Sequence, residues 1–218
     1  MEQAIVDHTG IINYLIKKYG YKTYLEIGVG DPRENFCLID CESKTGVDPY
    51  FDFNDVPFYG EEAIREINRN VKFRLTSDEF FEYLREDAKF DIIFIDGLHT
   101  EEQCDRDIQN SLLRLSKNGS IVVHDTNPYS SEHTVCRDEY IPGHTWNGDV
   151  YKSIAKLKVL GIPFVTYGGD QGVTVIKSPE NFVYTKNIGT IYFPYEYFAS
   201  NRTEFLNMVS QEEFLKQI

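Results

Sequence analysis

An apolar run at residues 24–27 leads directly into two glycines, Gly28 and Gly30, and this junction constrains the fold more than any other feature. Glycine adopts backbone angles that other residues rarely adopt, and it lets a ligand lie against the main chain. A buried strand that ends in such a turn is typical of an open α/β sheet, in which ligands bind at the carboxyl ends of the strands. The alternative is a glycine turn that joins strand and helix without binding a ligand.

Glu26, two residues before the first glycine, distinguishes this turn from those that bind dinucleotides. In the dinucleotide pattern G-x-G-x-x-G the third glycine would fall on Arg33. A carboxylate at this place suits a ligand with a cationic end, and S-adenosylmethionine has both an ammonium and a sulfonium group. We therefore predict that Glu26, Gly28 and Gly30 bind S-adenosylmethionine.

A second predicted strand, residues 43–47, ends at Asp48, about 20 residues after the glycine turn. An acid at this place binds the ribose hydroxyls in nucleotide-binding sheets, so Asp48 predicts a nucleoside without separating methyltransferases from dehydrogenases. A third strand ends in Thr76, Ser77 and Asp78. These residues favour the N-cap of a helix, and their polar groups can also reach an adenine edge. We expect Ser77 and Asp78 in the cofactor site.

The rest of the chain alternates between apolar strands and helices, which predicts a mostly parallel sheet with right-handed crossovers. The predicted helices are 4–18, 32–40, 78–85, 101–115 and 149–160, and the predicted strands of this part are 71–75, 90–95 and 120–123. Two last strands, 164–167 and 173–176, are joined by five turn residues and therefore form an antiparallel hairpin. The predicted fold is a Rossmann-like, doubly wound α/β sheet with one antiparallel strand in this hairpin.

Composition limits the partners of the chain. With 218 residues it fits one domain with a core of its own. Its formal net charge of −13 argues against nucleic acid, because nucleic-acid binders need clustered Lys and Arg. No apolar stretch approaches the roughly 20 residues of a membrane span. The four cysteines show neither a zinc pattern nor a disulfide framework, which suits a reducing compartment. We therefore expect a cytoplasmic protein. From the charge and the lack of an apolar span, we expect no nucleic-acid or membrane partner.

These motifs resemble those of the class I S-adenosylmethionine-dependent methyltransferases. The matching segments, within residues 21–177, are LEIGVG at 25–30, GVDP at 46–49, FIDG at 94–97 and the hairpin. More narrowly, IDGLH at 95–99 and VHDTN at 123–127 are similar to the small-molecule and sugar O-methyltransferases related to macrolide-sugar methyltransferases. That group also includes cephalosporin-hydroxylase-type proteins. The resemblance implies an enzyme that methylates a hydroxyl of a small molecule, such as a sugar or glycan precursor.

The resemblance also implies a divalent metal, Mg²⁺ or Mn²⁺, held by Asp96, His124 and Asp125. Adjacent strand tips bring these side chains to one crevice, and carboxylates with waters suit Mg²⁺. His124 stands where the group often has an acid. Imidazole shifts the preference toward Mn²⁺, Fe²⁺ or Zn²⁺, or else the histidine does acid–base work without a metal.

His99, three residues after Asp96, is the other candidate for chemistry. Either His99 or His124 can take the proton from an attacking hydroxyl, and we expect His99 in this role, with Asp96 and His124 as further catalytic residues. Asp96 is also expected to contact the cofactor. A bound metal would instead lower the pKa of the hydroxyl itself. A histidine at a helix start can also be a capping or packing residue only.

Two other functions remain open. A non-heme iron oxygenase of the cephalosporin-hydroxylase type would use Asp96, His99 and His124 as a two-histidine, one-carboxylate site. Such an enzyme has no use for the nucleoside pocket that Glu26 and Asp48 predict. A non-catalytic binding subunit on the same fold would not need intact cofactor motifs.

Two further regions are candidates for binding the acceptor or a second copy of the chain. Residues 126–148 form a connection longer than compact domains usually contain. Its side chains Tyr129, Tyr140, His144 and Trp146 suit sugar rings or polar aromatic acceptors, or else only anchor the connection to the core. Residues 179–218 are rich in aromatics and include a predicted helix at 202–215. We expect this extension to belong to the same domain as residues 1–178 and to cover the acceptor site or make a homodimer contact.

Overall fold

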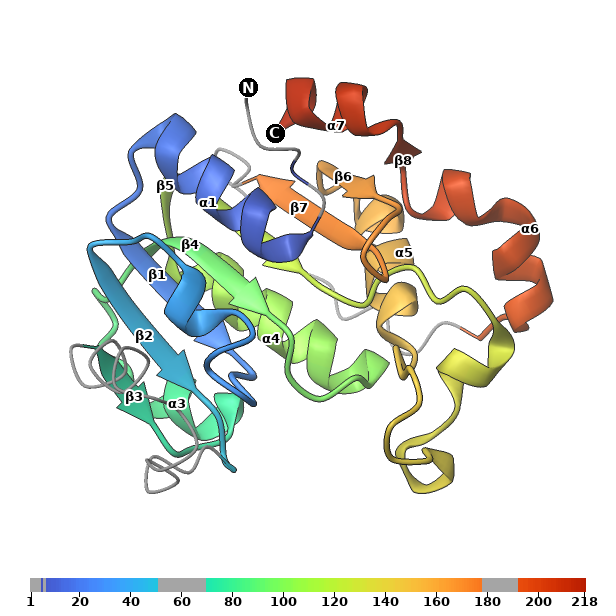
Figure 1. Ribbon diagram of the computed structural model, residues 1–218, viewed down its shortest axis with the longest axis horizontal. Coiled ribbons are helices and arrows are strands. Elements are labelled where there is room, and N and C mark those ends of the chain that lie inside the picture. The colour runs from blue at the N-terminus through green and yellow to red at the C-terminus, as the bar shows by residue number, and fades with distance from the viewer. Residues whose placement is uncertain (1–4, 6, 51–69, 178–191) are drawn as a thin grey trace.

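The computed structural model describes residue 5 and residues 7–50, 70–177 and 192–218, and these form an eight-stranded sheet with helices on both faces (Figure 1). The strands are β1 (Thr23–Ile27), β2 (Ser43–Val47), β3 (Val71–Phe73), β4 (Phe90–Ile95), β5 (Leu115–Val123), β6 (Phe164–Tyr167), β7 (Val173–Lys177) and β8 (Met208–Val209). The α-helices are α1 (His8–Tyr19), α3 (Ser77–Tyr83), α4 (Glu101–Arg114), α5 (Val150–Leu160), α6 (Tyr195–Phe205) and α7 (Gln211–Gln217).

The strand order is β3-β2-β1-β4-β5-β7-β6-β8. Strands β1 to β5 run parallel to one another, whereas β7 is antiparallel to both of its neighbours, β5 and β6. The predicted fold class, a mostly parallel α/β sheet with one antiparallel strand in a hairpin, is confirmed. The hairpin prediction succeeds because a five-residue turn is too short for the crossover that a parallel pair requires.

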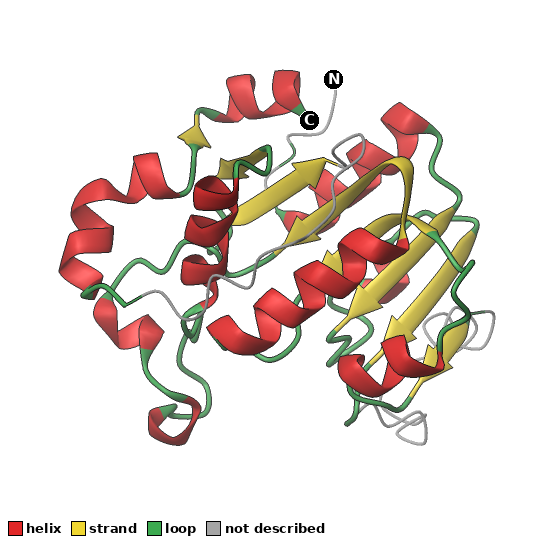
Figure 2. Ribbon diagram, turned by 180° about the vertical axis from the view of Figure 1, so that it is seen from behind, coloured by secondary structure: helices red, strands yellow, loops and turns green. Residues whose placement is uncertain are grey.

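Both faces of the sheet are buried, as a doubly wound sheet requires. Ile93 and Ile95 of β4 pack into the core under α3, α4 and α5, while Ile92 and Phe94 pack into the core under α1 and α7. Figure 2 shows the α4 face, opposite the α1 face that is in front in Figure 1. Because consecutive residues of a strand point to opposite faces, this alternation also decides where polar side chains near the strand tips point.

The predicted helix at 32–40 is wrong. The structure has only the 3₁₀ turn η1 (Phe36–Leu38) there. The buried ammonium of Lys44 donates to the carbonyl oxygens of Phe36 and Ile39, at 2.8 and 2.9 Å. These carbonyls are therefore satisfied by a side chain of β2 rather than by the amides of a longer helix.

The predicted helix at 202–215 is also wrong. Helix α6 ends at Phe205, Asn207 adopts a positive φ of 45°, and Ser210 caps the separate helix α7. Between the two helices, β8 pairs in parallel with β6. The apolar residues of this segment keep a helical spacing across residues 202–215. Pairing of β8 with the edge strand β6 nevertheless interrupts the helix.

Smaller differences concern the element ends. The first helix begins at His8, and residue 4, where the sequence placed its start, lies outside the described residues. Strand β3 is shorter than predicted, and β5 is longer because it begins at Leu115. The first part of the C-terminal extension, residues 179–191, also lies outside the described residues. Its described end is buried in the core that α1 covers, through Phe214 and Ile218. In the described part of the chain, every helix is too short or too polar to cross a lipid bilayer.

Candidate active site

The glycine turn after β1 lies directly against the tip of β4. Gly28 has a φ of 85°, and a Cβ atom at this position would lie 2.0 Å from the carbonyl oxygen of Asp96. Any side chain would therefore push the two strand tips apart. Gly30 has a φ of 51°, but nothing lies within 4 Å of the place that its Cβ would take. Gly28 thus allows the tips of β1 and β4 to lie in close contact, whereas Gly30 faces open space.

A cavity of about 470 Å³ opens beside this turn, at the carboxyl ends of β1, β2 and β4. Five of the predicted cofactor residues line it: Gly28, Gly30, Asp48, Ser77 and Asp96. The volume is in the range of pockets that hold small ligands and cofactors. The sequence therefore located the cavity correctly, although two of its predicted residues, Glu26 and Asp78, are not in the lining.

Asp48 and the glycine turn form one unit. One carboxylate oxygen of Asp48 accepts a hydrogen bond from the amide of Gly30 at 3.0 Å, and the other accepts from the amide of Tyr50 at 2.7 Å. These two donors fix the carboxylate at the wall of the cavity. Each oxygen keeps a second lone pair that can accept a hydrogen bond from a ligand.

Glu26 points away from the cavity, which corrects the expectation that it lines the ligand site. Strand alternation places it on the α1 side of the sheet, where only 1% of the residue is exposed. Its Oε2 accepts hydrogen bonds from the Tyr24 hydroxyl at 2.5 Å and from the Asn35 amide at 3.1 Å. Burial raises the pKa of Glu26 to about 8, with a further contribution from the negative charge of Asp96. The Glu26 carboxyl is therefore part of a buried hydrogen-bond network and holds its proton at neutral pH.

Asp78 also turns away from the cavity. Its carboxylate accepts hydrogen bonds from Gln103 at 3.2 Å and from Arg106 at 3.2 and 3.3 Å. Thr76, rather than Asp78, is the N-cap of α3, and it forms a capping box with Glu79. The arginine partner explains the orientation, because the ion pair satisfies the carboxylate outside the cavity.

The tips of β4 and β5 bring four titratable side chains together. Nε2 of His99 lies 3.4 Å from Oδ1 of Asp96 and 3.2 Å from Oδ2 of Asp125. Nδ1 of His124 lies 3.3 Å and 3.7 Å from the same two oxygens. Two imidazole nitrogens and two carboxylate oxygens thus alternate around a closed ring of contacts, which we call the four-residue centre.

The charges in the four-residue centre depend on one another. Burial alone would raise the pKa of Asp96, but His124 and His99 hold it well below its ordinary value. Burial opposes the charging of both imidazoles, yet the carboxylates raise the pKa of His99 to about 9 and that of His124 well above its ordinary value. For Asp125, burial and the charge of Asp96 raise the pKa to about 6. A His99 that holds its proton at neutral pH cannot accept another one, so its predicted role as the base is not the role that this environment favours.

The outer nitrogen of each ring is held by a backbone carbonyl. Nδ1 of His99 lies 2.7 Å from the carbonyl oxygen of Trp146, and Nε2 of His124 lies 3.0 Å from that of Asp170. The amide of Asn147 donates to Oδ1 of Asp125 at 2.8 Å. Asp125 itself has a φ of 58°, a strained conformation for a residue with a side chain. Such strain is concentrated at functional sites.

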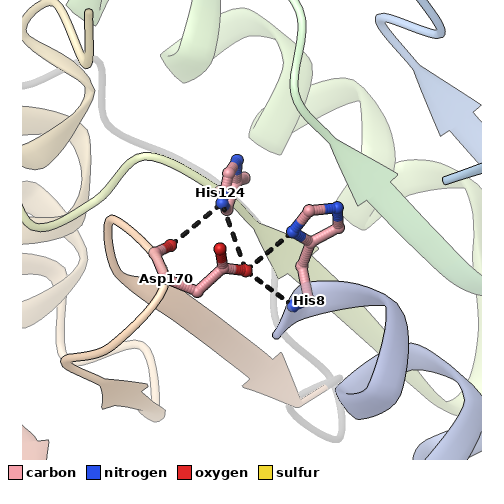
Figure 3. A group of neighbouring side chains, drawn as sticks. All are labelled: His8, His124 and Asp170. Carbon is pink, nitrogen blue, oxygen red and sulfur yellow. Dashed lines mark hydrogen bonds and ion pairs between the residues drawn. The ribbon is translucent and has the colours of Figure 1, made fainter. Parts of the chain in front are cut away.

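Two further residues at this site, His8 and Asp170, were not predicted from the sequence (Figure 3). Oδ2 of Asp170 accepts from the backbone amide of His8 and lies equally close, at 2.7 Å, to Nδ1 of its ring. The His8 ring also lies against His124, with 4.5 Å between the ring centroids. His8 begins α1 and Asp170 lies in the hairpin turn, so only the packing of distant segments brings them together.

The long connection after β5 closes one side of the site. Trp146 lines the cavity and stacks on His99, with 4.9 Å between centroids, and Tyr140 stacks on Trp146 at 5.2 Å. Arg137, from the 3₁₀ turn η3 (Arg137–Glu139), also lines the cavity. The expected acceptor residues Tyr129 and His144 are exposed. Of the four aromatic residues predicted for the acceptor site, Trp146 therefore lines the cavity and Tyr140 stacks on it, whereas the other two are exposed.

Comparisons with known proteins agree with this geometry. Residues 25–126 match the family described as methyltransferase domain. An O-methyltransferase from Bacillus cereus in complex with SAH is 12% identical, with a TM-score of 0.57 over 78% of this chain and 79% of that one. A Podospora anserina methyltransferase bound to SAH is 16% identical, with a TM-score of 0.54 over 78% of this chain and 77% of that one. No curated protein sequence is significantly similar to the chain.

The matched residues begin in β1 and end just after Asp125, so they include the glycine turn, Asp48 and the four-residue centre. The structural similarity covers 78% of this chain, a larger share than the family match, and it shows the same fold. Residues 25–126 therefore match a methyltransferase domain, and the chain has the fold of these two SAH-bound methyltransferases.

Proposed function

We propose that the enzyme transfers the methyl group of S-adenosylmethionine to a hydroxyl group of a small polar molecule, such as a sugar or glycan precursor. The observation that carries this proposal is the position of Asp96. It lines the cofactor cavity and also belongs to the four-residue centre, so the methyl donor and the acidic and imidazole groups share one wall. This is the arrangement that a transfer to a nearby hydroxyl requires.

The lining of the cavity supports S-adenosylmethionine as its ligand. Two methyltransferases of the same fold were solved with SAH, the product of methyl transfer from this cofactor. Four carboxylates line the cavity, from Asp31, Glu34, Asp48 and Asp96. They favour a ligand with ammonium and sulfonium groups over a dinucleotide, whose phosphates would be repelled. Asp48 is the proposed partner of the ribose hydroxyls.

The chemistry needs little covalent help from the protein. The hydroxyl oxygen forms a bond to the methyl carbon as the bond from this carbon to the sulfonium sulfur breaks, and the hydroxyl proton is lost. Because the sulfonium is already activated, the enzyme contributes in-line positioning and a destination for the proton. The four-residue centre, with its two carboxylates and two imidazoles, is where we place the acceptor hydroxyl.

Asp96, His124 and Asp125 fit a divalent cation, since their carboxylate oxygens and imidazole nitrogen face one another. The two carboxylates meet the preference of Mg²⁺ or Mn²⁺ for oxygen ligands. When bound, the ion would lower the pKa of the acceptor hydroxyl. The protein side chains would hold the acceptor oxygen close to the methyl donor, and Asn147 would keep Asp125 in place.

The proposed acceptor site lies between the four-residue centre and the connection after β5. Trp146 and Tyr140 present stacked aromatic faces there, and such faces suit the apolar side of a sugar ring. Arg137 is the one cationic side chain among the described residues that line the cavity.

Binding calorimetry followed by an acceptor screen tests the proposal. S-adenosylmethionine should bind to the purified chain more tightly than NAD. Methyl transfer from labelled S-adenosylmethionine to a panel of sugars, nucleotide sugars and polar phenols should then identify the acceptor, and EDTA should lower the rate. Tighter binding of NAD would contradict the proposed cofactor, and turnover that is unaffected by EDTA would remove the metal from the proposal.

A further inference from the structure

We propose that Arg137 forms an oxyanion subsite at the acceptor end of the cavity, so that the hydroxyl to be methylated belongs to an anionic molecule, one with a carboxylate or a phosphate group. This inference rests on the proposed function, because it names the substrate class of the same site. Binding of an anion can be measured without methyl transfer, so the two proposals fail in different ways.

The guanidinium of Arg137 has no hydrogen-bond or ion-pair partner in the described part of the chain, although Asp138 and Glu139 follow it directly. The other described arginines all have polar partners for their side chains: Arg33, Arg74, Arg85, Arg106, Arg114 and Arg202. An arginine side chain has five N–H donors in a planar fork that matches a carboxylate or a phosphate group. The fork of Arg137 is therefore available to a ligand.

This guanidinium lies at the wall where we place the acceptor. Arg137 lines the cavity together with Trp146, and both belong to the connection after β5. Within residues 126–148 it is the only Lys or Arg. Trp146 in turn stacks on His99 of the four-residue centre, with 4.9 Å between the ring centroids. The cation, the aromatic face and the four-residue centre thus lie in sequence along one wall.

Charge is divided along the cavity. The lining acids Asp31, Glu34 and Asp48 follow β1 and β2, whereas Arg137 belongs to the connection after β5. In the sheet, β4 separates β1 and β2 from β5, and Figure 1 shows the connection, in yellow, on the side away from β2. The acids suit the cationic groups of the cofactor at one end, and the guanidinium suits an anion at the other.

A single cation in this lining has a large influence on which acceptors can bind. The chain carries a formal net charge of −13, so an anion is repelled over most of the surface, and a neutral sugar gains nothing from Arg137. Two parallel hydrogen bonds from the guanidinium would attract the anion and also fix its orientation. The ring of the acceptor would then lie against Trp146, with its hydroxyl directed at the four-residue centre.

The methionine end of the cofactor also has a carboxylate, and this group is the competing partner of Arg137. The cofactor's ammonium is bonded to the same carbon atom as this carboxylate, so both groups lie at one end of the molecule. Asp31 and Glu34 beside the glycine turn favour the ammonium there. The carboxylate is then expected near the turn rather than at the connection, and we assign Arg137 to the acceptor.

Trp146 is the only tryptophan of the chain, so tryptophan fluorescence reports binding at this wall. The test titrates the SAH-saturated full chain with glucuronate and with glucose 1-phosphate, each against neutral glucose, at a constant low ionic strength because salt screens an exposed charge. At least one of the two anions should bind at least about tenfold more tightly than glucose, the effect of a hydrogen bond to a charged group.

Variants of Arg137 show whether the guanidinium causes this preference. Arg137→Gln should bind the anion no better than glucose, and Arg137→Lys, which keeps the charge without the fork, should retain part of the preference. The control Arg85→Gln removes an exposed arginine that pairs with Asp87 away from the cavity, and it should behave like the parent.

Calorimetry with SAH on each variant separates the two sources of the anion. Unchanged SAH binding by Arg137→Gln, with its preference for the anion lost, would support the acceptor subsite. Weaker SAH binding by this variant would assign Arg137 to the cofactor carboxylate and overturn the inference. So would a parent that binds SAH but no anion better than glucose, or a preference that survives in Arg137→Gln. A parent that prefers the anion through Arg137 but binds no SAH would contradict the proposed function alone.

Discussion

Glu26 is a buried acid and Asp96 a partly buried one at the tips of neighbouring strands, and they differ in their charge. Glu26 meets a hydroxyl and an amide, and burial raises its pKa to about 8. Asp96 meets two imidazoles, which outweigh the effect of burial and hold its pKa well below the ordinary value. Burial without a cationic partner keeps Glu26 protonated, whereas two imidazole partners keep Asp96 ionised. Only the ionised one lines the cavity.

The largest expected effect separates these two acids in catalysis. Asp96→Asn should lower the rate of methyl transfer by roughly 10²–10⁴-fold, because it removes a charge from both the cavity and the four-residue centre. Glu26→Gln should change the rate by no more than about threefold, since Glu26 lies outside the cavity and already holds its proton at neutral pH. Rates with labelled S-adenosylmethionine decide the matter. Equal losses in both variants would contradict the division of roles.

A second effect concerns stability and pH. The native state holds the Glu26 proton up to a pKa of about 8, whereas the unfolded chain releases it near the ordinary value of 4.5. The native state therefore binds more protons between these values, and the free energy of unfolding should fall as pH rises through this window. The limiting slope is about 1.4 kcal/mol per pH unit from this group, with no further change above pH 8.

Glu26→Gln isolates this contribution. Its neutral amide retains an oxygen that can accept the hydrogen bonds of Tyr24 and Asn35 but cannot ionise. Urea unfolding at a series of pH values should show that the difference between variant and parent grows in favour of the variant from pH 5 to pH 8. A constant difference across this range would show that Glu26 is ionised in the native protein.

The smallest expected effect concerns cofactor affinity. Asp48→Ala removes a hydrogen-bond acceptor for the ribose and also a partner of the Gly30 amide. S-adenosylmethionine should then bind more weakly by about 1.5–3 kcal/mol, the scale of a hydrogen bond to a charged group. Asp78→Ala is the matched control, since its carboxylate is turned toward Arg106 and away from the cavity. Calorimetry that finds the two variants equal would argue against the ribose assignment.

Much of the site followed from the order of strands along the chain. Apolar runs that end in glycine or acid identify strand tips, and parallel strands bring their carboxyl ends to one edge. This rule predicts that edge for Asp48, Asp96, His124 and Asp125, and the structure has them there. His99 follows Asp96 closely enough to share its position. Local sequence was sufficient where one strand tip determines the location of a residue.

The sequence does not predict a side chain's position where that position depends on the buried face of a strand or on a contact with a distant segment. Both faces of β1 are buried, so no alternation of polar and apolar residues shows that Glu26 points toward α1. His8 and Asp170 are separated by 162 positions and meet only after the helix and the hairpin have packed on the sheet. The break at Asn207 likewise depends on pairing between β8 and β6. Only the break has a local signal, because Asn207 and Ser210 are residue types that favour a left-handed conformation and a helix N-cap.

A crystal structure with SAH and Mn²⁺ tests the central claim most directly, because it locates the cofactor product and the ion relative to the four-residue centre in one experiment. We predict SAH in the cavity beside the glycine turn, its ribose hydroxyls on Asp48 and its sulfur next to Asp96, with the ion among Asp96, His124 and Asp125. SAH bound away from the cavity, or with its sulfur distant from Asp96, would contradict the account.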